Sequence, residues 1–579
     1  MPIQRSRLLI DKSEVAVAEG LVTAMHPLAA EAGVEILQRG GNAADAAVAA
    51  AFAVGVVEPF MSGVGGVACV VAHDAASGRT LTLDGAGVLP RAAREDLFEL
   101  LDPGLKGGGI YGWRATRDEA AETGYRSVAV PGAVATYVRL LETMGRLSLA
   151  EVMAPAIRLA EDGFPVDWYV FANCAAGLRR LQSFPHTMAA FFHADGTPLK
   201  TANADDIGKE EWLVQKDLAR TLRVIAEEGP DSFYRGEIGR TIANFLAVHG
   251  GLLTPEDLAD YRVRLRDPLW VDYRRRRIAL VSTNTGGPTV AQMFNILGGC
   301  DLAASGHNTA PTLHLLAEAQ RMAFADRFIH LGDPDFDPIP LEGLHSAAYA
   351  AERRGLIRPE GPPVSQPAGD PWPFQPGGRP AGMRPPSGTD AAEQHTTHLT
   401  VVDKERNLVS LTASLGQLFG SGVVVPGTGI TLNNGMMWFD PEPGKVNSMA
   451  PGKRALHAPT PALVFDRQGP YLAVGSPGGR KVLTAVQQVI HNVVDFGLGM
   501  QAAVSAPRIH CEGSPLHLDA RLPAEVIEAV ESFGHRVSVR EEHFLSSYFA
   551  RPNGILIDRR SGLLRSGVEP YKASAAVGY

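Results

Sequence analysis

The stretch QHTTHLTVVD, residues 394–403, places a Thr-Thr-His triplet at the start of a run in which apolar and polar residues alternate. Such alternation predicts a β-strand. If the His395–Thr396 bond were cut, Thr396 would become a new N-terminus, and its α-amine could activate its own hydroxyl as a nucleophile. The alternative is a plain strand rich in threonine, a residue that strands favour. The segment by itself favours the plain strand, whereas the rest of the chain favours the nucleophile.

Bulk composition describes a globular chain with enough apolar residues for a large core. The chain has 579 residues, of which 45% are hydrophobic and 20% charged, which is typical of globular proteins. The net charge of -9 argues against a nucleic-acid partner. The longest apolar stretch, residues 46–57, is too short to cross a membrane. We therefore expect no nucleic-acid or membrane partner.

Cysteine usage and the first residues bear on the compartment. Four cysteines occur and no CxxC pair is present, so the chain carries no sign of a disulfide framework. The apolar run near the N-terminus is three residues long, which is too short for the core of a signal peptide. These observations predict a reducing, cytoplasmic location.

Up to residue 395 the chain reads as mostly helical with some strands. Residues 28–57 predict a helix pair broken at Gly40-Gly41, with Asn42 capping the second helix. A core strand is expected at 67–71. Longer helices are expected at 140–162 and 313–331.

A change of pattern divides the chain in two. Residues 358–395 hold ten prolines, which predicts a mobile linker without regular structure. After it, a hairpin is expected at 398–414, because two alternating runs flank Lys404-Glu405-Arg406-Asn407. Further strands and a helix are expected at 429–432, 462–465, 471–474 and 481–493. We therefore divide the chain into a large part, 1–395, and a small strand-rich part, 396–579, within one intertwined catalytic domain.

Motifs across nearly the whole chain resemble the γ-glutamyltransferase family of N-terminal nucleophile hydrolases, in its amidohydrolase and cephalosporin-acylase-like branch. The matches run in family order. In the large part they are Gly40-Gly41-Asn42-Ala43, Ser62 to Gly66, Val130-Pro131-Gly132, Pro155 to Gly163, Ala325-Asp326-Arg327 and Gly332-Asp333-Pro334; in the small part they are Thr396-Thr397-His398, Phe419 to Gly422, Leu432-Asn433-Asn434, Pro451 to Arg454 and Gly475 to Gly479.

The resemblance implies an α+β fold, namely a four-layer αββα sandwich of the N-terminal nucleophile hydrolase type. It also implies a precursor that cleaves itself between His395 and Thr396 and remains as two associated fragments. Thr396 would then attack an amide and form an acyl-enzyme. The α-amine is a suitable general base because its reference pKa is about 7.7–8.0.

Three further residues take catalytic roles from the resemblance. Ser414, 18 positions after Thr396, stands where the family commonly has a threonine that binds the nucleophile's amine, and it keeps the hydroxyl. Gly478 and Gly479 match the oxyanion-hole glycines, whose backbone N–H groups stabilise developing negative charge. A tight turn after a strand would explain Pro-Gly-Gly equally well.

The substrate pocket departs from the family pattern. Family members bind the glutamyl head group with an arginine, an asparagine, an aspartate and two serines. In this sequence those positions fall on Ala86, Gly416, Trp438, His457 and Ala458. Removing one partner of a buried charge costs about 3–5 kcal/mol, so we expect an amidase with a changed acyl preference.

Two of the replacements are candidate substrate-binding residues. Trp438 makes the site more apolar, and His457 could donate a hydrogen bond to a substrate carboxylate or carbonyl. A histidine that only packs or bonds to backbone is an equal alternative for His457. The expected partners are a small-molecule amide substrate, the two fragments of the precursor, and further copies of the processed unit in a homo-oligomer.

Two alternatives stay open. The chain could be a true γ-glutamyltransferase or glutathione hydrolase, with Arg91 or Arg94 replacing the missing arginine. It could also be a non-catalytic relative that only binds ligands. The second alternative predicts damage at Thr396, Ser414 or the two glycines, and the sequence shows none.

No cofactor and no metal are expected. His395 and His398 flank the two threonines, but cleavage would separate the two histidines. No HExxH or cysteine-based motif supports a metal site.

Overall fold

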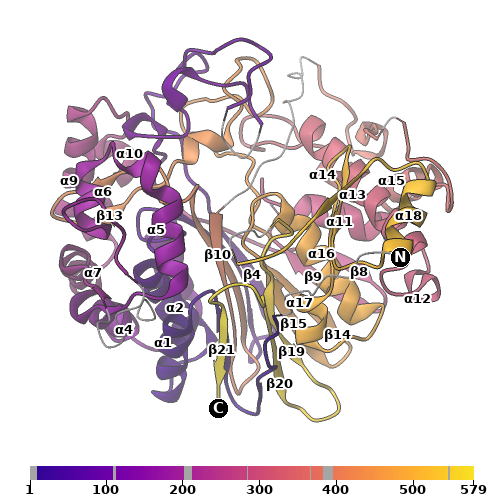
Figure 1. The fold of residues 1–579 in the computed structure, drawn as a ribbon, viewed down its shortest axis with the longest axis horizontal. Coiled ribbons are helices and arrows are strands. Elements are labelled where there is room, and N and C mark those ends of the chain that lie inside the picture. The colour runs from indigo at the N-terminus through magenta and orange to yellow at the C-terminus, as the bar shows by residue number, and fades with distance from the viewer. Residues whose placement is uncertain are drawn as a thin grey trace, which may run out of the picture.

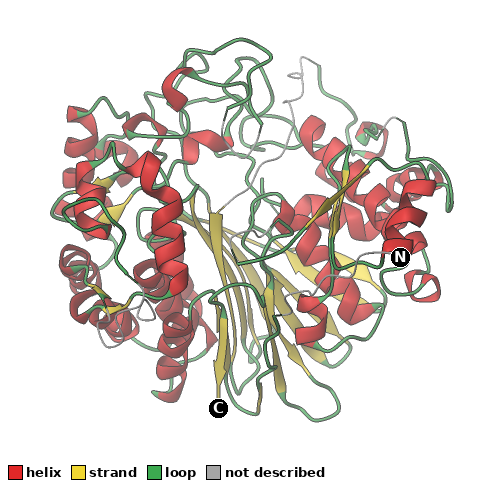
Figure 2. Cartoon of the chain, in the orientation of Figure 1, coloured by secondary structure: helices red, strands yellow, loops and turns green. Residues whose placement is uncertain are grey.

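Two antiparallel sheets lie at the centre of the folded protein, with helices on both sides of them (Figures 1 and 2). The computed structural model describes residues 10–107, 112–200, 211–282, 284–365, 367–381, 395–544 and 548–579, and for His395 only the backbone. Both sheets combine strands from before and after residue 395, so the large and small parts are intertwined within one structure.

The first sheet carries the strand that decides the fold. Its seven strands are all antiparallel to their neighbours. In sheet order they are β21 (Ala575–Gly578), β2 (Leu21–Ala24), β10 (His395–Val402), β11 (Leu408–Gly416), β3 (Val67–Asp74), β4 (Arg79–Gly85) and β7 (Arg264–Arg266). The hairpin predicted at 398–414 is confirmed as β10 and β11. β10 is an interior strand, hydrogen-bonded to β2 and β11.

The second sheet also has seven strands and is antiparallel throughout. In sheet order they are β1 (Ala16–Val17), β20 (Leu564–Val568), β19 (Asn553–Ile557), β15 (Gly469–Gly475), β14 (Ala462–Asp466), β9 (Arg276–Leu280) and β8 (Leu269–Tyr273). One buried apolar cluster joins residues of both sheets, among them Cys69 and Val402 of the first and Leu463 and Ile555 of the second. The strands predicted at 462–465 and 471–474 are confirmed as β14 and β15.

Smaller strands lie outside the two sheets. β12 (Val424–Val425) pairs with β13 (Ile430–Thr431), where the sequence predicts a strand at 429–432. β5 (Phe164–Pro165) pairs with β6 (Trp212–Leu213), and β16 (Ile509–His510), β17 (Leu516–Asp519) and β18 (Val537–Arg540) form a small mixed sheet.

Helices of the large part cover the first sheet. α2 (Ala43–Val57) is buried along its whole length because its residues are alanine, valine, glycine, phenylalanine and one capping aspartate. As predicted, Asn42 caps it, in a capping box with Asp45. The carboxylate of Asp403, at the end of β10, accepts a hydrogen bond of 2.8 Å from Ala43 N. The hairpin therefore fixes the start of α2.

The remaining helices of this side pack with α2 or flank it. They are α1 (Pro27–Gln38), α3 (Ala133–Met144), α4 (Leu149–Asp162), α5 (Trp168–Leu181), α6 (Pro185–Phe191), α7 (Lys216–Glu228), α8 (Asp231–Tyr234), α9 (Glu237–Val248) and α10 (Pro255–Ala259). The helices expected at 28–57 and 140–162 are confirmed as α1 to α4.

A second group of helices lies beside the second sheet (Figure 1). It contains α11 (Gly287–Leu297), α12 (Leu302–Ser305), α13 (Ala310–His330), α14 (Leu341–His345), α15 (Ala347–Gly355), α16 (Lys481–Val494), α17 (Met500–Ser505) and α18 (Ala524–Ser532). α13 and α16 confirm the helices predicted at 313–331 and 481–493. Within the part of the chain that the structure describes, no helix combines the length and apolar character needed to cross a membrane.

The segment predicted as a mobile linker is largely tied to the protein. Val364 N and Gly369 N donate to carboxylates of α13, and the Trp372 side chain is buried in the short 3₁₀ helix η3 (Trp372–Phe374). Prolines remove N–H donors from such a segment, but its carbonyls still accept hydrogen bonds, as Val364 O does from Arg321. Mobility is therefore the wrong prediction for 358–365 and 367–381, and residues 382–394 lie outside the described chain.

Candidate active site

Thr396 lies at an irregularity in the pairing of β10 with β11. His395 pairs with Gly416 and Thr397 pairs with Ala413, so the register shifts around Thr396. The Thr396 hydroxyl lies 3.2 Å from the Ser414 hydroxyl, and both side chains are buried. Ser414 Oγ also accepts a hydrogen bond of 2.9 Å from Gly416 N. The structure thus brings together the two hydroxyl residues that the sequence selects, in a chain that is continuous between 395 and 396.

The loop after α2 makes room for this pair. A Cβ atom on Gly66 would lie 2.6 Å from Ser414 O, closer than real Cβ contacts. Only glycine lets the loop approach the end of β11 so closely. The Ser62-to-Gly66 motif therefore supports the backbone that holds Ser414.

Glu58 is a buried carboxyl group beside the nucleophile strand. Thr397 follows Thr396 directly in the chain, and its Oγ1 donates a hydrogen bond of 2.6 Å to Glu58 Oε2. Burial raises the pKa of Glu58 to about 7, although the Thr397 hydrogen bond and the charge of Arg551 act to lower it. Sequence reasoning treated this residue only as the end of a helix. A carboxyl directly after twelve apolar residues, Ala46 to Val57, was the available indication.

His398 connects β10 to the second sheet. Its ring is fully buried, with Nδ1 2.8 Å from Thr412 Oγ1 and Nε2 3.2 Å from Thr400 Oγ1. Burial lowers the pKa of His398 to about 3, so the ring is neutral. A Cβ atom on Gly475 would lie 2.1 Å from the ring. The ring therefore packs on the backbone at the end of β15, where the Gly475-to-Gly479 motif begins.

Gly478 and Gly479 form a turn between β15 and α16. Their φ angles are +132° and +63°, which favour glycine. A Cβ atom on Gly478 would lie 2.6 Å from Ala550 Cβ. Arg551 N donates to Ser476 Oγ and to Pro477 O, both at 3.0 Å, which fixes the turn from the other side. Backbone N–H groups at the start of a helix suit the stabilisation of an oxyanion.

Gly416 stands where the family has an asparagine. Its φ is +106°, and a Cβ atom there would lie 2.0 Å from Asn434 Oδ1. Asn434 Oδ1 accepts a hydrogen bond of 3.1 Å from Gln417 N, and Asn434 Nδ2 donates to Glu122 O at 2.7 Å. The space for an asparagine side chain at 416 is therefore already used.

Trp438 belongs to an apolar cluster at the end of the short 3₁₀ helix η4 (Gly435–Trp438). Phe98, Met436, Met437 and Phe439 pack in the same cluster. Trp438 is 4% exposed. Ala86, at the position of the family's arginine, is also buried. Trp438 therefore lies in apolar surroundings, whereas the carbonyl of Ala86 accepts a hydrogen bond from the buried hydroxyl of Tyr261.

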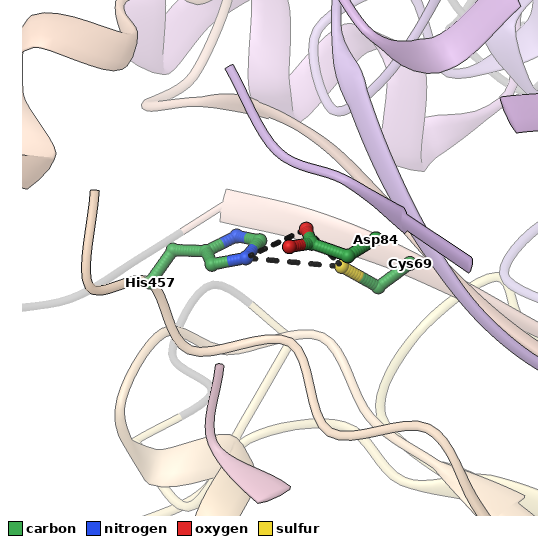
Figure 3. Close-up of side chains that lie close together, drawn as sticks. All are labelled: Cys69, Asp84 and His457. Atoms are coloured by element: carbon green, nitrogen blue, oxygen red, sulfur yellow. Dashed lines mark hydrogen bonds and ion pairs between the residues drawn. The ribbon is translucent and has the colours of Figure 1, made fainter. Parts of the chain in front are cut away.

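His457 is fully buried, and its imidazole faces protein groups (Figure 3). Its Nε2 lies 3.7 Å from Asp84 Oδ1 and 3.8 Å from Cys69 Sγ. The ring centroid lies 5.9 Å from that of Trp438. A direct substrate contact by His457 therefore stays a prediction, and in this structure the ring lies beside Trp438.

The two arginines considered as substitutes lie at the surface. Arg91 pairs with Asp260 and Arg94 with Asp96, and both guanidinium groups are more than half exposed. The structure does not bring either arginine into the buried surroundings of Ala86.

Comparison with known proteins agrees with the resemblance in the sequence. A family profile described as Gamma-glutamyltranspeptidase matches residues 29–579. The chain is 37% identical over 551 residues to the "Acylase ACY 1 proenzyme" of Pseudomonas sp. (strain SE83), covering 94% of this chain and 92% of that protein. It is 34% identical over 563 residues to the "Glutathione hydrolase proenzyme" of Bacillus subtilis (strain 168), covering 97% and 91%. A crystal structure of cephalosporin acylase from Bacillus halodurans matches with a TM-score of 0.84 and 30% identity, covering 100% and 99%.

The Glu58 carboxyl predicts a pH-dependent stability. Its pKa is raised from 4.5 to about 7 on folding, so the folded state holds the proton more tightly. Its stabilising effect is complete below about pH 4.5 and is lost as the pH rises through about 7, by about 3 kcal/mol in all. In the Thr396→Ala background, which keeps one covalent state, Glu58→Gln should unfold with the parent at pH 5. At pH 8 it should unfold about 2–3 °C above the parent. Equal midpoints at both pH values would contradict the assignment.

The contact between His398 and Gly475 predicts that position 475 accepts only glycine. Gly475→Ala places a methyl group against the imidazole, and overpacking of this kind costs about 1–3 kcal/mol. We expect a lower thermal midpoint and less of the protein cleaved before Thr396, measured by calorimetry and gel densitometry. Gly513→Ala is the control, since a Cβ atom there meets no atom within 4 Å. Equal behaviour of the two variants would show that this contact does not constrain β10.

Proposed function

The chain belongs to the gamma-glutamyltranspeptidase family, and from this premise we propose that it is a self-processing amidohydrolase whose nucleophile is Thr396. The observation that carries the proposal is the buried pair of hydroxyls, Thr396 Oγ1 and Ser414 Oγ, which lie 3.2 Å apart on the adjacent interior strands β10 and β11. Relatives that cover most of the chain are named as proenzymes. The fold is mixed α and β with antiparallel sheets. The apolar cluster shared by the sheets and the two groups of helices support the four-layer αββα arrangement.

Maturation begins with the Thr396 hydroxyl. Its oxygen attacks the carbonyl carbon of residue 395, the peptide C–N bond breaks, and Thr396 N takes up a proton as the free amine. Water then hydrolyses the ester, which releases a large fragment, 1–395, and a small fragment, 396–579. Both fragments contribute strands to both sheets, so cleavage leaves them associated.

Turnover uses the same hydroxyl on a substrate amide. The new α-amine accepts the Thr396 hydroxyl proton, and the oxygen attacks the substrate carbonyl. The N–H groups of Gly478 and Gly479 stabilise the oxyanion, and Ser414 holds the amine and hydroxyl in position. The amine of the substrate leaves with a proton, and the acyl group stays on Thr396. Water or a second amine then removes the acyl group from the threonine oxygen.

The pocket around Gly416, Ala86 and Trp438 suits an acyl group of the substrate other than γ-glutamyl. Gly416 and Ala86 supply no side-chain ligand for a charged head group, and Trp438 adds apolar surface. A relative named as an acylase and a neighbour titled as a cephalosporin acylase agree with this preference. The named glutathione hydrolases among the relatives keep γ-glutamyl hydrolysis as the second candidate.

The proposed partners are a small-molecule amide and the two fragments of the precursor. Assembly of processed units into a homo-oligomer stays a prediction. A cytoplasmic location also stays a prediction.

Self-processing predicts a defined pair of products. Wild type should give a small fragment whose first residue is Thr396, and Thr396→Ala should remain one chain. Thr396→Ser keeps a hydroxyl and should still be cleaved, at a lower rate. Intact mass and N-terminal sequencing measure all three. Cleavage in Thr396→Ala at the same bond would exclude Thr396 as the processing nucleophile.

The altered pocket predicts a reversed substrate preference. With one leaving group, p-nitroaniline, the processed enzyme should have a higher kcat/KM for an apolar N-acyl substrate than for the γ-glutamyl substrate. Loss of even one buried ionic contact costs about 3–5 kcal/mol, so the ratio should be at least about 100. A γ-glutamyl substrate that is turned over as well as the apolar one would support the glutathione hydrolase alternative.

A further inference from the structure

Three side chains with metal-binding atoms, Cys69, Asp84 and His457, converge in the protein interior (Figure 3). Cys69 and Asp84 are direct partners across β3 and β4. Opposite residues on antiparallel strands project to the same face, so the two side chains lie side by side. His457 reaches them from the loop before β14. All three residues are at most 1% exposed.

The spacing of the three donor atoms suits a shared ion. Cys69 Sγ lies 3.9 Å from Asp84 Oδ1 and 3.8 Å from His457 Nε2, and His457 Nε2 lies 3.7 Å from Asp84 Oδ1. The last distance is too long for an N–H···O hydrogen bond. With metal–ligand bonds of about 2.0–2.3 Å and angles of about 109–120°, donor atoms around zinc lie about 3.4–3.8 Å apart. Small movements would therefore bring all three atoms to bonding distance of one ion.

The chemistry of the ligands also favours a divalent cation. A divalent ion bound by one thiolate, one carboxylate and one neutral imidazole forms a group with no net charge. An uncharged group is cheaper to bury than an isolated charge.

Backbone contacts hold the ligands in place. Ala86 N donates to Asp84 Oδ1 at 3.0 Å. His457 N donates to Asn284 O at 3.0 Å, and Arg327 donates to His457 O at 2.8 Å. The contacts of His457 are made by its main-chain N and O, and they hold the loop that carries the ring. A donor set of one sulfur, one nitrogen and one carboxylate oxygen selects zinc over magnesium or calcium, which prefer oxygen ligands alone.

We propose that Cys69, Asp84 and His457 bind one Zn²⁺ ion, with a water molecule as the fourth ligand. The ion joins the loop that carries His457 to β3 and β4 of the first sheet, and it fixes the imidazole beside Trp438. Metal binding does not depend on the acyl specificity proposed above, although it uses His457, one of the candidate substrate-binding residues.

The metal content of the purified protein tests the proposal. The Thr396→Ala chain is expressed with added zinc, freed of loose metal by gel filtration, and analysed by plasma mass spectrometry. We expect about one zinc ion per chain, and a loss of at least about tenfold in Cys69→Ser and His457→Gln. Cys300→Ser, which changes a cysteine outside the cluster, is the matched control and should keep the ion. Metal-free protein, or zinc that persists equally in all the variants, overturns the proposal.

Cobalt substitution gives a second measurement that does not depend on whether each variant folds. The Thr396→Ala chain is grown with cobalt in place of zinc. Its absorption spectrum should then show a thiolate-to-cobalt charge-transfer band, which the Cys300→Ser control should keep. A protein that carries cobalt without this band would exclude Cys69 as a ligand and overturn the site.

Discussion

The position of Thr396 depends on the burial of strand β10 on both of its faces. Toward the large part, the strand rests on α2, and Asp403 at its end holds the first N–H of that helix. Toward the second sheet, the neutral ring of His398 packs on Gly475. A strand fixed on both sides presents its first residues in a defined geometry, which an N-terminal nucleophile requires. Glu58 and Ser414 then bind the hydroxyls of two successive residues, Thr397 and Thr396.

The same constraint accounts for the polar and apolar halves of the site. The proposed catalytic groups are polar, namely the hydroxyl of Ser414, 3.2 Å from that of Thr396, and the backbone N–H groups of Gly478 and Gly479. Beyond them, Gly416 and Trp438 leave no ionic ligand where family members bind a charged head group. A Cβ atom at 416 would collide with Asn434 Oδ1, so the proposed change of acyl preference involves the packing of this region.

Local patterns in the sequence predicted a large share of the fold. The cap at Asn42, the alternation in β10 and β11, and the apolar spacing of α13 and α16 depend on neighbours in the chain, which a sequence displays directly. The mobility of the linker was mispredicted because prolines report lost donors, whereas the remaining N–H groups of the segment donate to carboxylates of α13 and its carbonyls accept from arginines. The environment of Glu58 and the grouping of Cys69, Asp84 and His457 could not be predicted from local patterns for a related reason. Their partners lie 339 residues away in one case and up to 388 in the other.

Covalent trapping of the acyl-enzyme tests the central claim most directly. The processed protein is mixed with an apolar N-acyl ester or amide and quenched in acid, and the small fragment is digested and analysed by tandem mass spectrometry. The account predicts one acyl group per processed unit, attached to the side-chain oxygen of Thr396 in the peptide that begins with that residue. An acyl group on another side chain, or substrate turnover with no acylated Thr396 at any quench time, would contradict it.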